Sequence, residues 1–166
     1  QYTKDLIGSL GEVLAGPPDL QVFELFGGRS VPPAPRGPGF YRFGIGQIKA
    51  TGLSDGFALF RPIYPTFGGS LPAAEVAALL ESAMLDPEGG TVECSPLLLD
   101  TPGGRVLIDT GAGTLFGPTL GKLGHNLAAA GVRADSIDAV VLTHAHPDHI
   151  GGLLDHAGRV AFPKAE

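Results

Sequence analysis

The chain has 166 residues, of which 43% are hydrophobic and 17% charged, which suits one globular domain and excludes a disordered chain. Its formal net charge of −6 argues against a general nucleic-acid or anionic-membrane binder, because both need a basic surface. No apolar run approaches the ~20 residues of a membrane span. The single cysteine, Cys94, excludes an intrachain disulfide and is expected to be a buried small hydrophobe at a strand end. The compartment stays open, either periplasmic or secreted, or cytoplasmic.

The first part of the chain differs in composition and residue spacing from the rest. Leu6, Ile7, Leu10 and Leu14 recur at helical spacing and predict a short amphipathic helix. A segment rich in proline and glycine follows and predicts an extended linker, because proline lacks a backbone donor and restricts its neighbour. We therefore divide the chain into an N-terminal arm with its linker (1–39) and one domain (40–166).

Strands and a helix are expected in the first half of this domain. Two strands joined by the "GIGQ" turn are expected from Phe40, and the "SDG" at Ser54–Gly56 indicates a turn that ends the hairpin. Ser70–Leu85 predicts a helix, with Val76, Leu79, Leu80 and Met84 along one face.

The second half is expected to repeat this alternation. Two strands are expected near Ser95–Asp100 and Val106–Asp109, joined by a Pro-Gly-Gly turn, then a helix near Leu123–Ala130. The run "IDAVVLT" is continuous and β-branched, which predicts a buried strand. The order of elements indicates an α/β fold in which helices cover a sheet.

A dense cluster of metal-binding residue types follows the last of these strands. The stretch "THAHPDHIGG" holds three histidines and an aspartate within His144–His149. Alternate residues of an extended segment share a face, which pairs His144 with His146. Pro147 favours a helix start, which leaves Asp148 and His149 paired in the first turn.

Four ligands within six positions are more than one mononuclear site normally draws from a single loop. Two divalent ions about 3.5–4 Å apart would use all four. Imidazole and carboxylate donors suit zinc, manganese, iron or cobalt, and geometry alone does not choose among them; of these we expect two zinc ions.

Asp109 ends an apolar strand and enters a Gly-rich loop. It is either a loop-capping carboxylate or a group that orients the ligand loop, and both roles are compatible. Thr143, directly before the cluster, is predicted to share the orienting role. By contrast, His125 is expected to be a surface or capping residue, and His156 has no partner at ligand spacing.

The string from His144 to His149 resembles the HxHxDH signature of the metallo-β-lactamase-fold hydrolases, and "VLIDTGAG" resembles their Asp-Thr-Gly element. Residues 38–166 look like the branch that includes methyl parathion hydrolase and related lactonases. The resemblance implies an αββα sandwich and a metallo-hydrolase that cleaves lactone, ester or organophosphate bonds in small molecules through a metal-bound hydroxide.

The resemblance also implies roles for individual residues. His144 and His146 would bind the first metal ion, and Asp148 and His149 the second, with Asp148 also positioning the attacking hydroxide. Phe116 would form a wall of an apolar substrate pocket, although ordinary loop packing explains it equally well.

One departure from the family pattern bears on activity. The family's second αβ half supplies a further His, a bridging Asp and another His. Here only Asp155 and His156 follow His149, and they are too close to it in sequence to come from that half. The chain is therefore expected to be the first αβ half of the sandwich. Two readings follow: half of a dinuclear hydrolase, or an incomplete, non-catalytic half-domain that needs a second polypeptide, either another copy or a complementary C-terminal half.

Overall fold

A computed structural model describes residues 39–166, so the predicted N-terminal helix and most of the linker lie outside the described residues. The described helices and strands are β1 (Phe40–Ile45), β2 (Ile48–Leu53), β3 (Gly56–Phe60), α2 (Ala73–Ser82), β4 (Gly90–Cys94), β5 (Leu97–Thr101), β6 (Gly104–Ile108), α3 (Leu123–Ala129), β7 (Ala139–Val141) and α4 (Pro147–Ile150), with short 3₁₀ turns at Ala134–Ser136 and Gly151–Leu153. The expected mixture of strands and covering helices is confirmed.

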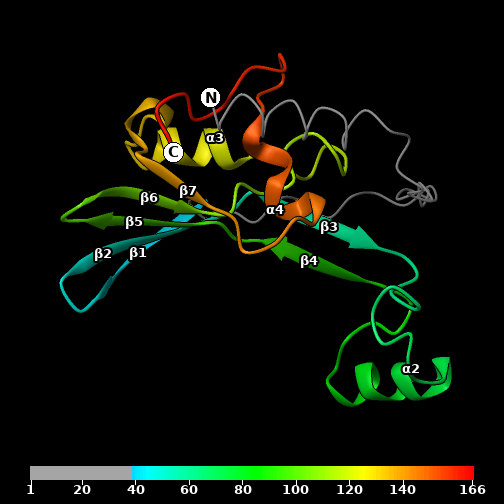
Figure 1. Cartoon of the computed structure of the whole chain (residues 1–166). Coiled ribbons are helices and arrows are strands. Elements are labelled where there is room, and N and C mark those ends of the chain that lie inside the picture. Colours follow the sequence, from blue (N-terminus) through cyan, green and yellow to red (C-terminus); the bar gives the residue numbers. More distant parts are fainter. Residues whose placement is uncertain (1–38) are drawn as a thin grey trace.

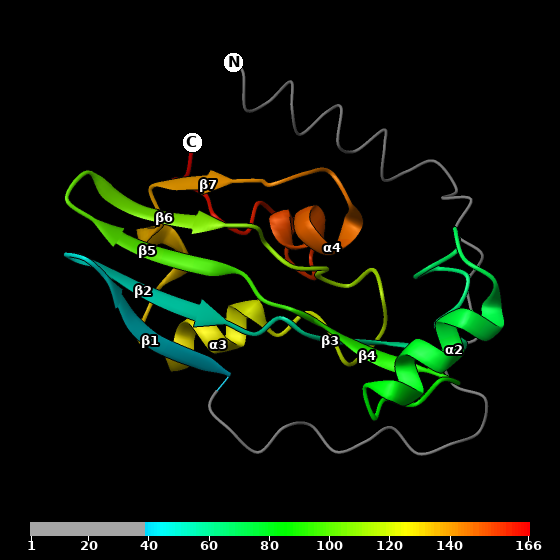
Figure 2. The same ribbon diagram turned by 90° about the horizontal axis from the view of Figure 1, so that it is seen from below.

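Five strands form the main sheet, in the order β1-β2-β5-β6-β7 (Figures 1 and 2). Neighbours are antiparallel except for β6 and β7, which run parallel, so the segment between these two strands crosses over the sheet and contains α3. The two predicted hairpins are confirmed, because their turns are encoded locally: Gly46 adopts φ 60° and Gly104 φ 136°.

One face of this sheet carries the main hydrophobic core. Helix α3 lies on that face (Figure 1). Leu98 and Leu107 from the sheet, which are 1% and 0% exposed, pack with Leu127 from the helix and with Ile137. Each such side chain contributes about 1.5–3 kcal/mol of transfer free energy. This packing fixes the position of the β6–β7 edge, from which the cluster residues extend.

The opposite face of the sheet is exposed along its two edge strands. Tyr41, Phe43 and Ile45 alternate along the edge strand β1 and are 72%, 40% and 49% exposed, and Val141 on β7 is 49% exposed. The prediction that "IDAVVLT" forms a buried strand is therefore wrong in part. The strand is short, and only its α3-facing side, with Val140, packs on the core.

A smaller two-stranded sheet, β3–β4, extends from the main sheet and leads to α2, which lies away from the main sheet (Figure 1). The helix was expected, and Val76, Leu79 and Leu80 lie in it at the predicted spacing, but Met84 does not belong to it and the apolar face is largely uncovered. Val76 is the buried residue of α2, whereas Leu79 is 56% exposed and Met84, beyond the helix end, is 94% exposed. An amphipathic pattern buries a face only where a neighbouring element lies against it. Within residues 39–166, no helix has the length and apolarity needed to cross a membrane.

Candidate metal centre

The cluster lies where β7 gives way to α4. His146 is extended, with φ −70° and ψ 147°, and Pro147 begins the helix, as the sequence predicts. Asp148 and His149 therefore fall in the first turn of α4. The first predicted ligand pair, His144 and His146, therefore lies on extended backbone, and the second pair lies on helical backbone.

The first predicted pair lies together. Nε2 of His144 is 3.0 Å from Nδ1 of His146, and the ring centroids are 4.7 Å apart. The hydroxyl oxygen of Thr143 lies 3.1 Å from the other ring nitrogen of His144. Both imidazoles are thus oriented by polar neighbours rather than free to rotate.

The second pair is oriented by Asp109. Nδ1 of His149 donates to a carboxylate oxygen of Asp109 at 2.8 Å. Nε2 of the same ring lies 3.3 Å from the carboxylate of Asp148. The ring of His149 also lies 3.9 Å, centroid to centroid, from that of His144, so the two pairs are adjacent.

Asp109 holds the loop as well as the ring. Its carboxylate accepts the backbone N–H of Thr143 at 2.8 Å and the Thr143 hydroxyl at 2.8 Å. Burial pushes the pKa of Asp109 up, but the bonds from Thr143 and His149 together hold that pKa below its ordinary value. Asp109 adopts φ 59°, a left-handed conformation that Asp tolerates better than most residues. The structure thus places the Asp109 carboxylate against both Thr143, directly before the cluster, and His149, the last histidine of the cluster.

The backbone after Asp109 lies directly on the backbone after His149. Thr110 donates its N–H and its hydroxyl to the carbonyl of His149, at 2.8 and 2.9 Å. A Cβ on Gly151 would fall 2.2 Å from the Ala112 carbonyl oxygen, and one on Gly152 would fall 2.0 Å from that of Thr110. This close approach gives a physical reason for the two glycines that follow the cluster.

The donor types suit a zinc-like ion, because imidazole nitrogens and a carboxylate are its usual nitrogen and oxygen ligands. Among residues 39–166, however, no group of three or more His, Cys, Asp or Glu side chains comes together in a form that could hold a metal ion. The cluster is therefore two adjacent pairs of donors rather than a closed coordination site.

The other residues of interest lie as follows. Phe116 is half-buried and packs against the small cluster of Cys94, Ala112 and Leu120. Burial is the main cause that raises the pKa of Cys94 to about 11, in line with an inert buried thiol. His125 and His156 are exposed.

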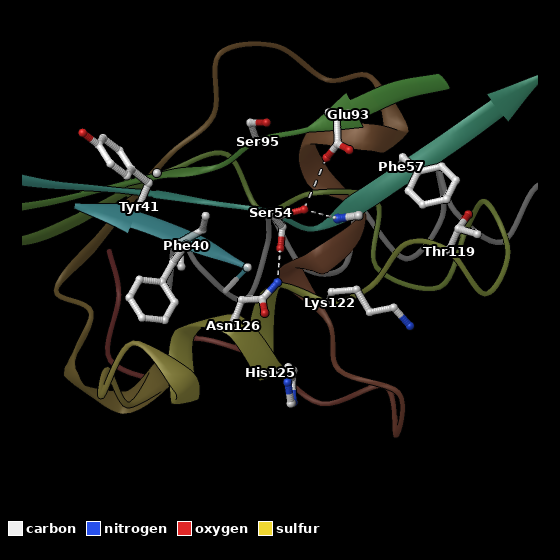
Figure 3. Close-up of a pocket in the computed structure, with 14 residues that line it drawn as sticks. Phe40, Tyr41, Ser54, Phe57, Glu93, Ser95, Thr119, Lys122, His125 and Asn126 are labelled. Carbon is white, nitrogen blue, oxygen red and sulfur yellow. Dashed lines mark hydrogen bonds between the residues drawn. The ribbon is translucent and has the colours of Figure 1, made fainter. Parts of the chain in front are cut away.

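Of two cavities in the described part of the chain, one of about 530 Å³ lies away from the cluster, beside α3 and the junction of β2 with β3 (Figure 3). Phe40, Phe57, Lys122 and Asn126 are among its lining residues, and none of the four cluster residues is. The second, about 410 Å³, is lined by Asp55, Thr110 and Gly152 among others.

Asp55 is a buried charged residue that the sequence marks only as part of a turn. It is 0% exposed, and its carboxylate accepts two backbone N–H groups of the loop that follows Asp109 and that of Leu123, the first residue of α3. Nothing local in "SDG" distinguishes a buried carboxylate from a solvated one, because all three donors lie far along the chain.

The described residues thus form an α/β domain in which a helix covers one face of a sheet and a His/Asp cluster follows the carboxyl end of a strand. Residues 89–165 match the family model of the metallo-beta-lactamase superfamily. The matched residues include the whole cluster from His144 to His149, and members of this superfamily are generally hydrolases.

Solved structures of the same fold are similar to the chain. AidC, a dizinc quorum-quenching lactonase, matches with a TM-score of 0.71 and 31% identity over 76% of this chain and 43% of its own. The hydrolase AbOPH of the beta-lactamase superfamily matches with a TM-score of 0.70 and 32% identity, over 79% and 44%. A probable metal-dependent hydrolase from Staphylococcus aureus gives 0.59 and 26%, over 74% and 47%. The chain thus spans less than half the length of each of these relatives.

Proposed function

We propose that this chain provides one side of a dinuclear, zinc-dependent hydrolase site that acts on lactone, ester or organophosphate bonds in small molecules. The observation that carries the proposal is the pairing of His144 with His146 and of Asp148 with His149, in two adjacent pairs. A lactonase and other hydrolases among the similar structures support the substrate class.

Each residue has a proposed part in this site. His144 and His146 would hold one ion, and Asp148 and His149 the other. Asp109 keeps Nδ1 of His149 engaged as a donor, so the lone pair of Nε2 would be available to an ion held jointly with the carboxylate of Asp148, 3.3 Å away. Phe116 would contribute an apolar wall for the substrate. Bound divalent ions would supply Lewis acidity, which polarises the scissile bond and makes water a better nucleophile.

Metal titration tests the ligand assignment. We expect the 166-residue chain to bind Zn²⁺, and the variants His144→Ala/His146→Ala and Asp148→Asn/His149→Ala each to lose about half of the bound metal. His125→Ala is the matched control, because His125 is an exposed histidine outside the cluster, and it should bind like the parent. Equal binding by all four proteins would overturn the assignment.

Hydrolysis tests the reaction. The zinc-loaded chain is assayed against acyl-homoserine lactones, aryl esters and aryl phosphotriesters, with the two ligand variants as blanks. Turnover that disappears in both variants is the expected result. Metal binding without turnover on any of the three classes would reject a hydrolytic activity for this chain by itself.

A second candidate is a half-domain that completes its site with another polypeptide, either a second copy or a complementary C-terminal half. The exposed apolar face of the sheet favours it, because Tyr41, Phe43 and Ile45 form a row of large apolar side chains on one edge strand. Sedimentation of the zinc-loaded chain tests it. A soluble monomer with two tightly bound ions would count against this candidate.

A further inference from the structure

Asp55 joins the two ends of the loop that follows Asp109. The residue lies between β2 and β3 and is 0% exposed. One carboxylate oxygen accepts the backbone N–H of Ala112 at 2.9 Å and that of Gly121 at 3.2 Å, and the other accepts that of Leu123 at 2.9 Å. A single buried anion thus satisfies donors at the start of the loop, at its end and in the first turn of α3.

The segment that carries Asp55 is itself held on several sides. The backbone N–H of Asp55 donates to the carbonyl of Cys94 at 2.8 Å. The side-chain amide of Asn126 donates to the carbonyl of Ser54 at 2.6 Å, and the N–H of Gly56 donates to the Ser54 hydroxyl at 3.0 Å (Figure 3). The carboxylate is therefore presented from a fixed junction between the two sheets.

The loop fixed in this way lies against the end of the cluster. A Cβ on Gly111 would lie 2.3 Å from the Asp55 carboxyl carbon, so the loop backbone packs directly on this carboxylate. The carbonyl of Gly111 accepts the N–H of Gly152 at 3.2 Å, and Thr110 donates twice to the carbonyl of His149. Thr110 and Gly111 therefore connect Asp55 to the backbone of His149, a proposed metal ligand.

We propose that Asp55 is a positioning residue for the metal centre: it fixes the loop 111–122 and, through that loop, the backbone of His149–Gly152. That this restraint serves a metal centre rests on the proposed function. The restraint of the loop and of the His149–Gly152 backbone by Asp55 does not require bound metal. Charge-assisted bonds from three N–H groups are directional, so they set the position of the loop as well as its stability.

The variant Asp55→Asn tests the proposal, because it keeps the size of the side chain and turns one acceptor into a donor that faces backbone N–H groups. We expect Zn²⁺ affinity to fall about 10–100-fold, as for other residues that orient metal ligands. Ile137→Val and Ile137→Ala are the controls, since they lower stability through the core under α3. At matched loss of melting temperature, the controls should keep Zn²⁺ affinity within about threefold. Equal loss of affinity in Asp55→Asn and in the matched control would overturn the proposal.

Amide hydrogen exchange of the unmodified chain without metal tests the restraint where Asp55→Asn does not fold or the chain binds no zinc. The N–H groups of Ala112, Gly121, Leu123 and Gly152 should open together, as one cooperative unit. Opening of Ala112 and Gly121 independently of Gly152 would contradict the proposal even if the chain binds zinc. Joint opening in a chain that binds no zinc would support the restraint and reject the proposed function.

Discussion

Gly152→Ala is expected to be strongly destabilising, because the new methyl group has no room. Its Cβ would fall 2.0 Å from the carbonyl oxygen of Thr110, and relief to an acceptable contact of about 3 Å needs a backbone shift of about 1 Å. The neighbouring chain is held in place by the bonds of Thr110 to His149. Overpacking of this kind costs about 1–3 kcal/mol of the free energy of unfolding.

Gly124→Ala is the matched control. Gly124 lies in α3, and a Cβ there would meet no atom within 4 Å, so helix propensity should stabilise the variant by about 0.5–1 kcal/mol. Urea denaturation followed by circular dichroism should therefore separate the two variants by about 1.5–4 kcal/mol. A Gly152→Ala chain as stable as the parent would refute the packing of the two glycine-containing backbones, and with it the route by which the loop positions His149.

The remaining predictions concern stability and reactivity. Leu107→Ala should cost about 2–5 kcal/mol because the side chain is 0% exposed, whereas Met84→Ala, at 94% exposure, should stay within about 0.5 kcal/mol of the parent; equal losses in urea denaturation would contradict the core assignment. The thiol of Cys94, with its pKa raised to about 11 mainly by burial, should react with a disulfide reagent at pH 8 only as the chain unfolds; rapid reaction of the native chain would argue against its burial. The side-chain bond from Arg159 is the main cause that lowers the pKa of Asp155 to about 2, so its contribution is present above the unfolded value of 3.8 and lost as pH falls towards 2. The stability gap between the parent and Asp155→Asn should therefore close over that range, and a gap that persists at pH 2 would contradict the ion pair.

Local signals in the sequence predict those parts of the fold that depend on neighbouring residues. The turns at Gly46 and at Gly103–Gly104 are specified by glycines, and the turn into α4 is specified by Pro147, so both hairpins and the pairing of His144 with His146 follow from spacing alone. Features that depend on distant segments are not visible in this way. The strand pair β3–β4 joins segments on either side of α2, and β3, with the sequence GFALF, lacks the regular alternation that would reveal it.

The same distinction between local and distant signals explains which residues of the candidate site could be predicted from the sequence. Asp109 is predicted because it ends an apolar strand in a glycine-rich loop. Asp55 is missed because its donors Ala112, Gly121 and Leu123 lie 57–68 positions further along the chain, so burial comes from the tertiary fold. The exposure of Leu79 on the apolar face of α2 has the same cause, because the apolar spacing of that helix does not encode which element, if any, packs against it.

Anomalous diffraction at the zinc absorption edge, from crystals of the 166-residue chain grown with Zn²⁺, tests the central claim most directly. We predict zinc at the cluster, beside the paired rings of His144 and His146 and beside Nε2 of His149 and the Asp148 carboxylate. Zinc bound only elsewhere, for instance at the exposed rings of His125 or His156, or no bound zinc at all, would contradict the account.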